Sequence, residues 1–390
     1  MDSAQPLYDL APIARVALMG IALAAGPLAW VWLRNREAGS VGRLRALTLL
    51  TLFLTFDLVL FGAFTRLTDS GLGCPDWPGC YGNASPLGAS ADIHAAQTAM
   101  PSGPVTHGKA WVEMIHRYLA TGVGVLITVL AIASWFEARR RKRDGGSGVS
   151  PWWATATLVW VAVQGAFGAL TVTMKLYPAI VTLHLLGGLG LLALLAAQLE
   201  GYRRAPLALP GRLYGAALGV FALCVIQIAL GGWVSTNYAV LACTDFPTCQ
   251  GAWWPLMDFD HGFTIWRALG EGKDGGWLPF AALTAIHYMH RLMAYVVLAG
   301  LAWLAWRLWR AGSEVPPLRR WALAFGGVAL WQLASGLSNV VLGWPLVAAV
   351  AHTGGAAMIV VLMTVLLTRA HQARQTAAAR DAGRLSVAAS

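Results

Sequence analysis

Four histidines lie within otherwise apolar segments, and their positions suggest where this chain does chemistry. His116 is the fourth residue of the phrase Glu-Met-Ile-His-Arg-Tyr, and His290 is the fourth residue of the similar phrase His-Tyr-Met-His-Arg-Leu in the second half of the chain. A second histidine follows each of them along the sequence, His184 after His116 and His352 after His290. An ionisable side chain is costly within a membrane span, so these residues are functional hypotheses by default.

Two histidines at one depth on facing helices hold a planar iron porphyrin from both faces. His116 lies about seven residues into its apolar segment, which at 1.5 Å per residue is roughly 10 Å deep. His184 lies at a similar depth, and His290 and His352 repeat the pattern. The alternative for a single membrane histidine is an interhelical hydrogen bond. Four histidines at equivalent depths favour haem ligation, whereas zinc would need a third or fourth close ligand.

Charged neighbours of these histidines distinguish the two halves. Arg117 and Arg291 each follow a histidine, and a guanidinium group suits either a haem propionate or the outer lipid headgroups. Three residues before its histidine the first half has Glu113, where the second half has His287. Glu113 shares a helix face with His116, so its carboxylate can accept protons, stabilise a developing positive charge or hydrogen-bond a ligand imidazole. The asymmetry predicts chemistry at the first site and electron transfer at the second.

Five cysteines divide into two loop pairs and one residue in an apolar segment. Cys74 and Cys80 lie in one polar loop, Cys243 and Cys249 lie in another, and Cys224 is the apolar one. Paired loop cysteines in an oxidising compartment are typical of disulfides, so we predict one bond in each loop. The alternatives are a metal site and, for the first loop, a redox-active pair that relays electrons. Cys224 is expected to act as a small hydrophobic residue.

The composition is that of a polytopic membrane protein. Of the 390 residues, 57% are hydrophobic and 12% are charged, and the mean hydropathy is +0.59. A soluble globular domain would have about 25% charged residues. The formal net charge of +10 does not indicate nucleic acid, because the arginines form short clusters between apolar segments, as cytoplasmic loops do. The 19 tryptophans fit the aromatic belts at membrane interfaces.

Segments of about 20 apolar residues can cross a bilayer, and the sequence predicts nine of them. With nine spans all the basic clusters fall on one side, which is therefore cytoplasmic. The amino terminus and the loops 68–108 and 236–280 are then expected on the outer side. The predicted spans are 12–33, 44–67, 109–135, 152–172, 179–199, 213–235, 281–306, 321–341 and 346–368.

An internal repeat organises these spans. The two cysteine phrases are offset by 169 positions (243 − 74), His116 and His290 by 174, and His184 and His352 by 168. Two copies of the motif Gln-x3-Gly, which begin at positions 164 and 332, are also 168 apart. Each half has an even number of spans, so the repeat is parallel. We predict an all-α polytopic membrane protein with two pseudo-symmetric four-helix bundles and one extra N-terminal transmembrane helix.

The repeat also predicts the domain boundaries. The extra helix and its cytoplasmic loop occupy residues 1–43, and the first four-helix half occupies residues 44–200. A cytoplasmic linker at 201–212 leads to the second half at 213–370, and a cytoplasmic tail follows at 371–390.

Taken together, these features resemble the haem A synthase family of the cytochrome oxidase assembly pathway. The resemblance covers residues 44–370, which is nearly the whole chain except the first span. Each motif alone is unspecific, but the combination is specific. The matching elements are the phrase from Gly62 to Cys74, Glu113-x-x-His116-Arg117, His184, His290-Arg291 and His352.

The resemblance implies an enzyme that oxidises the C8 methyl group of haem O to the formyl group of haem A through successive hydroxylations. The first half, with His116, His184 and Glu113, is then expected to hold the substrate haem. The second half, with His290 and His352, is expected to hold a permanent haem b that relays electrons. If both axial positions of the substrate iron are filled, water becomes the expected source of oxygen. Family members have eight helices, so the extra first span is a departure.

The resemblance further implies a bacterial inner-membrane protein whose cysteine loops face the periplasm. Its expected partners are a haem O synthase and cytochrome oxidase assembly proteins, and both a monomer and a homo-oligomer stay open. Two other functions use the same histidines. A non-catalytic dihaem b-type electron-transfer protein has no use for Glu113, and a haem transporter or chaperone would open and exchange its ligands.

Overall fold

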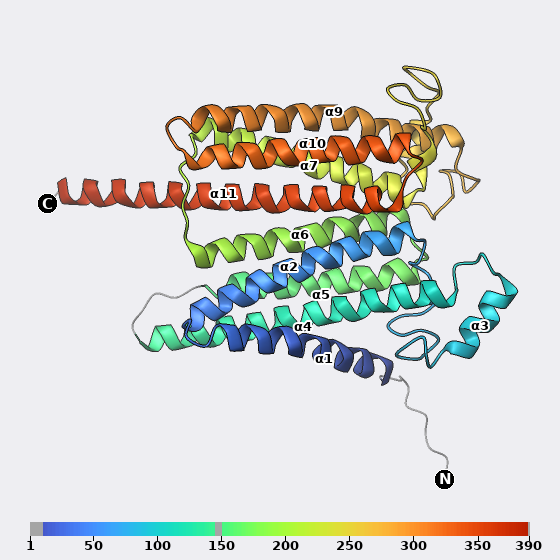
Figure 1. Cartoon of the computed structure of the whole chain (residues 1–390), viewed down its shortest axis with the longest axis horizontal. Coiled ribbons are helices and arrows are strands. Elements are labelled where there is room, and N and C mark those ends of the chain that lie inside the picture. Colours follow the sequence, from blue (N-terminus) through green and yellow to red (C-terminus); the bar gives the residue numbers. More distant parts are fainter. Residues whose placement is uncertain (1–10, 145–149, 389–390) are drawn as a thin grey trace, which may run out of the picture. The chain divides into compact units, whose positions relative to one another are not determined.

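The computed structural model describes residues 11–144 and 150–388, with side chains as far as residue 380. The described chain consists of helices joined by loops, and it is an all-α polytopic membrane protein, as predicted (Figure 1). The elements in chain order are α1 (Ala11–Arg34), α2 (Ser40–Leu67), α3 (Ser90–Ala99), α4 (His107–Arg143), α5 (Trp152–Thr173), α6 (Pro178–Arg203), α7 (Gly211–Thr236), η1 (Ala239–Leu241), α8 (Phe259–Gly262), α9 (Phe280–Ala311), α10 (Pro317–Val341) and α11 (Leu346–Ala388).

Two compact units make up the chain, residues 1–184 and residues 185–390. The boundary falls inside α6, directly after His184, so this helix contributes residues to both units. The boundaries 44–200 and 213–370, which follow from the sequence repeat, stay a prediction. The segment 371–388, predicted as a tail, continues α11 as helix.

In the first unit α4 is the central helix, and it packs against α1, α2 and α5 (Figure 1). The side chain of Thr106 caps its first turn by accepting a hydrogen bond from the backbone N–H of Lys109. Gly20 of α1 lies so close to α4 that a Cβ atom there would be 2.4 Å from Cγ2 of Thr121. Small residues let membrane helices approach closely. The extra first helix is therefore packed directly on the helix that carries His116.

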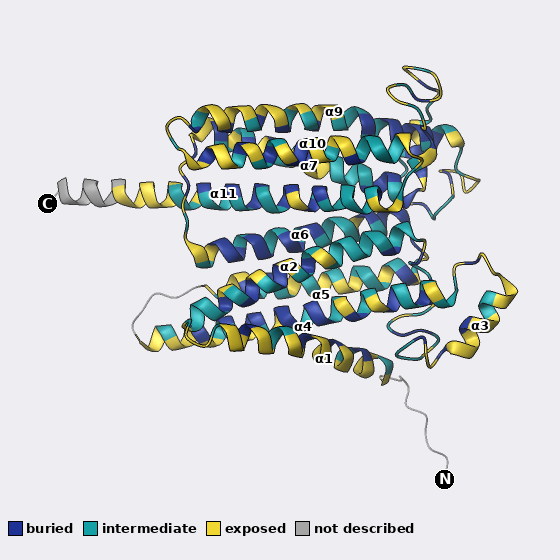
Figure 2. Ribbon diagram, viewed as in Figure 1, coloured by how far each residue is buried: buried dark blue, intermediate teal, exposed yellow. Residues whose placement is uncertain are grey.

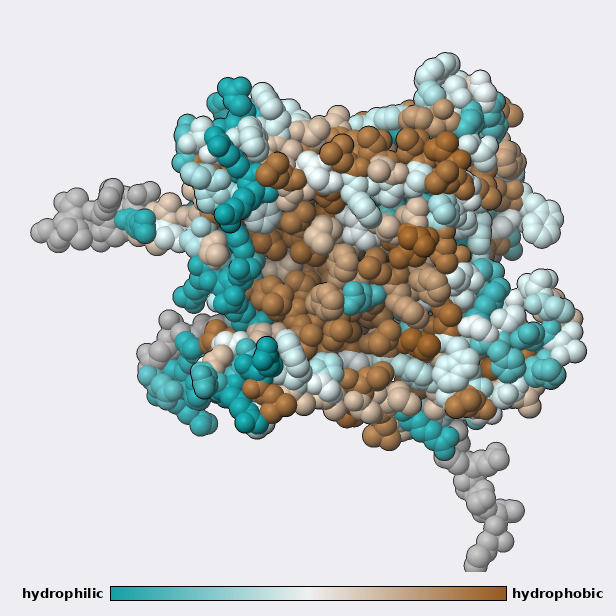
Figure 3. Space-filling model, viewed as in Figure 1, coloured by the Kyte–Doolittle hydropathy of each residue, from teal (hydrophilic) through white to brown (hydrophobic). Residues whose placement is uncertain are grey.

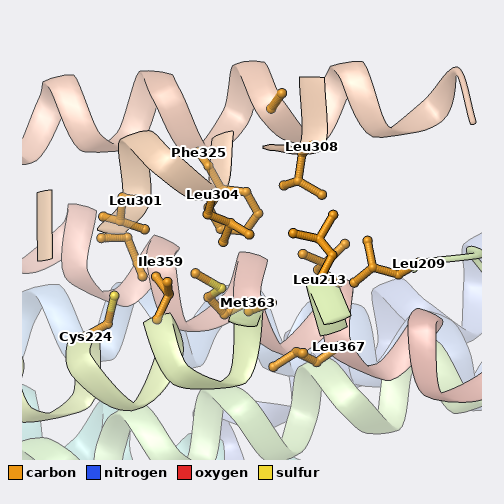
Figure 4. Packing of buried hydrophobic residues seen from close by; sticks show 14 of the residues in the cluster. Leu209, Leu213, Cys224, Leu301, Leu304, Leu308, Phe325, Ile359, Met363 and Leu367 are labelled. Atoms are coloured by element: carbon orange, nitrogen blue, oxygen red, sulfur yellow. The ribbon is translucent and has the colours of Figure 1, made fainter. Parts of the chain in front are cut away.

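In the second unit α7, α9, α10 and α11 pack around an apolar core. Figure 4 shows Leu304 of α9 and Phe325 of α10 within this cluster, together with Met363 of α11. Cys224 of α7 belongs to the same cluster and is 2% exposed, which is the small hydrophobic role predicted for it. The cluster occupies the part of α9 that follows His290 and the part of α11 that follows His352. Apolar packing therefore fixes the helices that carry these two histidines.

Eight helices of the described residues are long and apolar enough to cross a membrane, one fewer than the nine predicted spans. The exception is α10, which forms at the predicted place and packs against α9 and α11. Its second half carries Gln332, Ser335, Ser338 and Asn339, which lower its hydropathy. Its 25 residues measure about 37 Å, enough to span the hydrocarbon region. The eight are α1, α2, α4, α5, α6, α7, α9 and α11.

The outward surfaces of the helices are apolar. Exposed residues line the flanks of the long helices in Figure 2, and in Figure 3 hydrophobic residues cover the middle of the helices. Only 11% of the most apolar stretch of α5 is buried, and Trp160 and Val163 are among its exposed side chains. Soluble monomers rarely expose such continuous apolar surface. Contact with lipid accounts for it, because the helices satisfy their own backbone hydrogen bonds.

Candidate functional site

The four predicted histidines form two pairs, one in each unit. His116 lies on α4 and is close enough to His184 on α6 for an electrostatic interaction. His290 on α9 has the same relation to His352 on α11. All four residues are half-buried. The structure therefore brings together the partners that the sequence repeat predicts.

Each histidine of the second unit packs against a glycine of a neighbouring helix. A Cβ atom at Gly231 of α7 would lie 2.9 Å from Cε1 of His290, a distance that real Cβ atoms essentially never show. A Cβ atom at Gly336 of α10 would lie 3.2 Å from Cε1 of His352, which is tighter than nine in ten real Cβ contacts. A glycine at each position therefore gives the imidazole ring its room.

The first unit repeats the arrangement with one difference. A Cβ atom at Gly168 of α5 would lie 3.4 Å from Cε1 of His184, an ordinary contact. At Gly62 of α2 the nearest atom of His116 would be Nε2, at 3.1 Å, and not Cε1. The His116 ring therefore presents a different edge to its glycine than the other three rings do. Phe61 also stacks on His116, with the ring centroids 6.3 Å apart.

Glutamine amides contact three of the four histidines. Nε2 of Gln164 donates to the backbone carbonyl of His184 at 2.5 Å and lies 3.0 Å from its Nδ1. Nε2 of Gln227 donates to the carbonyl of His290 at 3.1 Å and lies 3.1 Å from its Nδ1. Both glutamines stand four residues before the glycine that faces the same ring. The motif Gln-x3-Gly thus holds a histidine by its backbone and by one edge of its ring.

His352, the partner of His290, has two polar contacts. In the orientation that satisfies both ends of its amide, Gln332 donates to the carbonyl of His352 at 3.0 Å and lies 3.2 Å from its Nδ1. The Ser335 hydroxyl donates to the carbonyl of Trp331 at 2.7 Å and lies 2.9 Å from Nδ1 of His352. Both polar contacts of the ring are at Nδ1, so neither of them occupies Nε2 of His352.

In the loop that follows α2, Cys74 and Cys80 form a disulfide, as predicted. The carboxylate of Asp76 accepts hydrogen bonds from the backbone N–H groups of Tyr81 and Gly82, at 2.6 and 2.8 Å. Gly82 has φ +70°, a left-handed conformation that glycine adopts without steric cost. The loop is therefore a closed, locally hydrogen-bonded unit.

Glu113 and Arg117 attach this loop to α4. Arg117 donates from Nη2 to Oε1 of Glu113 at 2.6 Å, and both side chains are less than a tenth exposed. Oε2 of Glu113 accepts from the backbone N–H of Cys74 at 2.8 Å. Nη1 of Arg117 donates to the carbonyls of Asp76, Pro78 and Gly79 at 2.9, 3.3 and 2.5 Å. The predicted catalytic carboxylate therefore also anchors the loop, and contact of Arg117 with a propionate stays a prediction.

The second cysteine loop has the same local structure. Cys243 and Cys249 form a disulfide, and Asp245 accepts from the backbone N–H groups of Gln250 and Gly251 at 2.7 and 3.0 Å. The Thr248 hydroxyl also donates to this carboxylate. These hydrogen bonds, first that of Thr248 and then that of Gly251, lower the pKa of the Asp245 carboxyl to about 2. Asp76 and Asp245 are offset by the same 169 positions (245 − 76) as the cysteines.

Arg291 anchors the second loop as Arg117 anchors the first. It donates to the carbonyls of Cys243, Asp245 and Thr248 at 2.6, 2.8 and 3.0 Å. Its Nε donates to Nε2 of His287 at 3.3 Å, so the buried imidazole stands where the first unit has the Glu113 carboxylate. A role of Arg291 as a propionate ligand likewise stays a prediction.

The donor set suits a haem. Within the described ranges no group of three or more His, Cys, Asp and Glu side chains could hold a metal ion. Bis-imidazole coordination uses one nitrogen on each face of a porphyrin. The glycines that face the four imidazoles leave the rings room beside the neighbouring helices. The residues present therefore fit an iron porphyrin between each pair.

Sequence reasoning missed the residues that orient the imidazoles. The repeat of the sequence includes the motifs at positions 164 and 332, but it does not point to the copy at Gln227 and Gly231. Gln227 precedes His290 by 63 positions, whereas Gln164 precedes His184 by 20, so the two pairs share no spacing. Gln164 and His184 lie on consecutive helices, α5 and α6, whereas a long loop separates the helices of Gln227 and His290, α7 and α9. Ser335 carried no sequence signal.

Comparison with known proteins gives a consistent result. A profile of the COX15-CtaA family, described as cytochrome oxidase assembly protein, matches residues 45–364. A haem A synthase of Shewanella oneidensis is 36% identical over 330 residues, which are 81% of this chain and 93% of that protein. A haem A synthase of Sphingopyxis alaskensis is 32% identical over 344 residues, 81% of this chain and 88% of that protein. The residues that the family profile matches include all four histidines and both cysteine loops.

Proposed function

The chain belongs to the COX15-CtaA family of cytochrome oxidase assembly proteins, and we propose that it is an oxidoreductase that converts haem O to haem A. Relatives that carry the name haem A synthase align over most of both chains and support this function. The observation that carries the proposal is the asymmetry of the two histidine pairs. Glu113, a buried carboxylate, lies one turn from His116, and its counterpart beside His290 is an imidazole.

The first pair is the proposed substrate site. His116 and His184 would hold the iron of haem O, the substrate. The glycines Gly62 and Gly168 leave room for the two imidazoles. The second pair, His290 and His352, holds a haem b. A haem b bound there supplies one-electron transfer between the substrate site and an acceptor.

The proposed reaction oxidises the C8 methyl group in two hydroxylations. Each takes up one water and releases two electrons and two protons, so the methyl becomes a hydroxymethyl and then a geminal diol. Loss of one water from the diol gives the formyl group, and the net change is one water consumed with four electrons and four protons released. A lipid-soluble electron acceptor is needed to take the electrons. With both axial positions of the substrate iron filled by histidine, water is the proposed oxygen source.

Glu113 is the proposed catalytic residue. Its carboxylate is buried and paired with Arg117, and a carboxylate in this position can act as the base that accepts a proton from water. The carboxylate accepts hydrogen bonds from Arg117 and from the backbone N–H groups of Cys74 and Gly73, which leaves one of its four lone pairs for water. The same negative charge stabilises positive charge that develops on the substrate.

Location and partners follow from the same proposal. The basic clusters between the spans support a cytoplasmic side opposite the cysteine loops, so these loops face the periplasm. A haem O synthase is the proposed supplier of substrate, and cytochrome oxidase assembly proteins are the proposed consumers of the product. The bilayer is the medium through which the substrate arrives.

Pigment analysis of variants tests the proposal. Glu113→Gln keeps an acceptor for the N–H of Cys74 but removes the charge, so it should retain haem and lose haem A production. His287→Gln, at the same position of the second unit, is the matched control and should still make haem A. Normal haem A production by Glu113→Gln would contradict the catalytic role. Haem B alone at two per chain, unchanged when haem O is co-produced, would instead identify a dihaem electron-transfer protein.

A further inference from the structure

One of the four glutamine positions is missing, and it is the one beside His116. Gln227 and Gly231 correspond to Leu58 and Gly62, because both pairs are 169 positions apart (227 − 58 and 231 − 62). This is the offset of the cysteine loops. A leucine cannot donate a hydrogen bond to a backbone carbonyl or to an imidazole. The His116 ring therefore lacks the amide that contacts each of the other three.

No other described residue of the first unit takes the place of that amide. In the part of the chain that the structure describes, the His116 ring forms no hydrogen bond with a protein group. Its neighbours are the face of Phe61, at a centroid distance of 6.3 Å, and Gly62. Both contacts are apolar, so rotation of the ring breaks no hydrogen bond.

The second unit has the opposite character. Its two rings are contacted by three polar side chains, Gln227 at His290 and both Gln332 and Ser335 at His352.

In the first unit the position that corresponds to Ser335 is Phe167 (335 − 168), which has no hydroxyl to offer an imidazole. His184 consequently keeps one polar partner, Gln164. Among the described residues, the number of side chains that orient the rings by hydrogen bonds falls from three in the second unit to one in the first.

We infer that His116 is the ligand that releases and captures the exchanging haem, whereas Gln227, Gln332 and Ser335 are positioning residues that make ligation in the second unit permanent. The inference rests on the proposed function, in which the first site must take up haem O and give up haem A. An exchangeable site needs one ligand that can leave at low cost, and His116 is that ligand. His184, held by Gln164, is the ligand that stays in place.

Adding the missing amide tests the inference. The variant Leu58→Gln supplies to His116 what Gln227 supplies to His290, and Leu49→Gln is the matched control, since Leu49 is an exposed residue of the same helix. The purified full-length protein, loaded with haem O and haem B, is mixed with excess apomyoglobin, and the rate at which each haem leaves is measured by mass analysis. One hydrogen bond corresponds to about a three- to tenfold change in such a rate.

We expect Leu58→Gln to slow the loss of haem O about three- to tenfold, with a shift in the electron paramagnetic resonance g values of that haem. Leu49→Gln should behave as the unmodified protein. The reverse change, Gln227→Leu, should speed the loss of haem B and leave haem O unaffected, which keeps the test decisive if Leu58→Gln does not fold.

Equal rates and equal g values in Leu58→Gln and the unmodified protein would overturn the inference, and so would an unchanged rate of haem B loss in Gln227→Leu. Failure of the proposed function has a different signature. In that case the unmodified protein would bind no haem O, or would bind it and never yield haem A, whatever the exchange rates of the variants.

Discussion

Arg117→Ala should open the first cysteine loop. Arg117 is the single cation beside the buried Glu113 carboxylate among the contacts described above, and its Nη1 also binds three carbonyls of the loop. Removing one partner of a buried ion pair costs about 3–5 kcal/mol, because the other charge is left uncompensated. We take the lower figure, about 3 kcal/mol. That corresponds to about a hundredfold rise in the population of the open loop, since each 1.4 kcal/mol is a factor of ten.

The disulfide reports this opening, because Cys74 and Cys80 are both 0% exposed and a reductant reaches them only when the loop detaches. The purified protein is treated with a membrane-impermeant phosphine, and the freed thiols are alkylated and counted by mass. The bond Cys74–Cys80 should be reduced about a hundred times faster in Arg117→Ala. The bond Cys243–Cys249, anchored by Arg291, is the internal control and should keep its rate.

A second substitution separates charge from hydrogen bonding. In the double variant Arg117→Ala with Glu113→Gln no uncompensated charge remains, so reduction should be slower than in Arg117→Ala alone. Equal reduction rates for Cys74–Cys80 in Arg117→Ala and the unmodified protein would refute the reasoning. It would mean that the arginine does not hold the loop.

Two further predictions concern the second unit. Gly231→Ala should displace His290, because the new Cβ would lie 2.9 Å from Cε1 of that ring. The haem content of the purified protein should then fall by about one per chain. The control is Gly219→Ala on the same helix, which has open space around its Cβ and should keep both haems. The hydrogen bonds that lower the Asp245 pKa to about 2 stabilise the loop Cys243–Cys249 above the ordinary pKa of 3.8, and this contribution is lost as the pH falls through 2. Reduction of the Cys243–Cys249 bond by the phosphine reagent should therefore speed up as the pH falls from about 4 to about 2. In Asp245→Asn the same bond should be reduced fast at every pH in that range. A reduction rate that does not change with pH in the unmodified protein would contradict this prediction.

Most of the fold follows from local properties of the sequence. Hydrophobic length identifies a membrane helix, because about 20 apolar residues are what a bilayer requires. The one departure, α10, arises where Gln332, Ser335, Ser338 and Asn339 interrupt the apolar pattern. Two of these, Gln332 and Ser335, orient His352. The span that is least apolar is therefore also one that carries polar contacts of the site.

The roles of the charged residues were harder to predict. For Arg117 and Arg291 the sequence predicts either of two roles, propionate binding or contact with lipid headgroups. The structure shows a third, because the side chains donate to carbonyls of the cysteine loops. Arg117 lies 38 positions from Gly79 and Arg291 lies 48 positions from Cys243, and a backbone carbonyl carries no signal in a sequence. Such a contact becomes visible only when the loop is folded over the helix.

The sequence by itself determined the class of protein, the repeat, the four histidines and the pairing of the cysteines. These depend on composition, on length and on the offset between like residues, all of which can be read along one dimension. Tertiary structure alone decided which side chain meets which imidazole. The contacts of Gln227 with His290 and of Gly62 with His116 join helices that are distant in sequence, and the ring edge that each glycine faces depends on how those helices pack. That Leu58 stands where an amide would contact His116 can be recognised only from the packing, because the packing shows that the glutamines at the other three positions each contact a histidine.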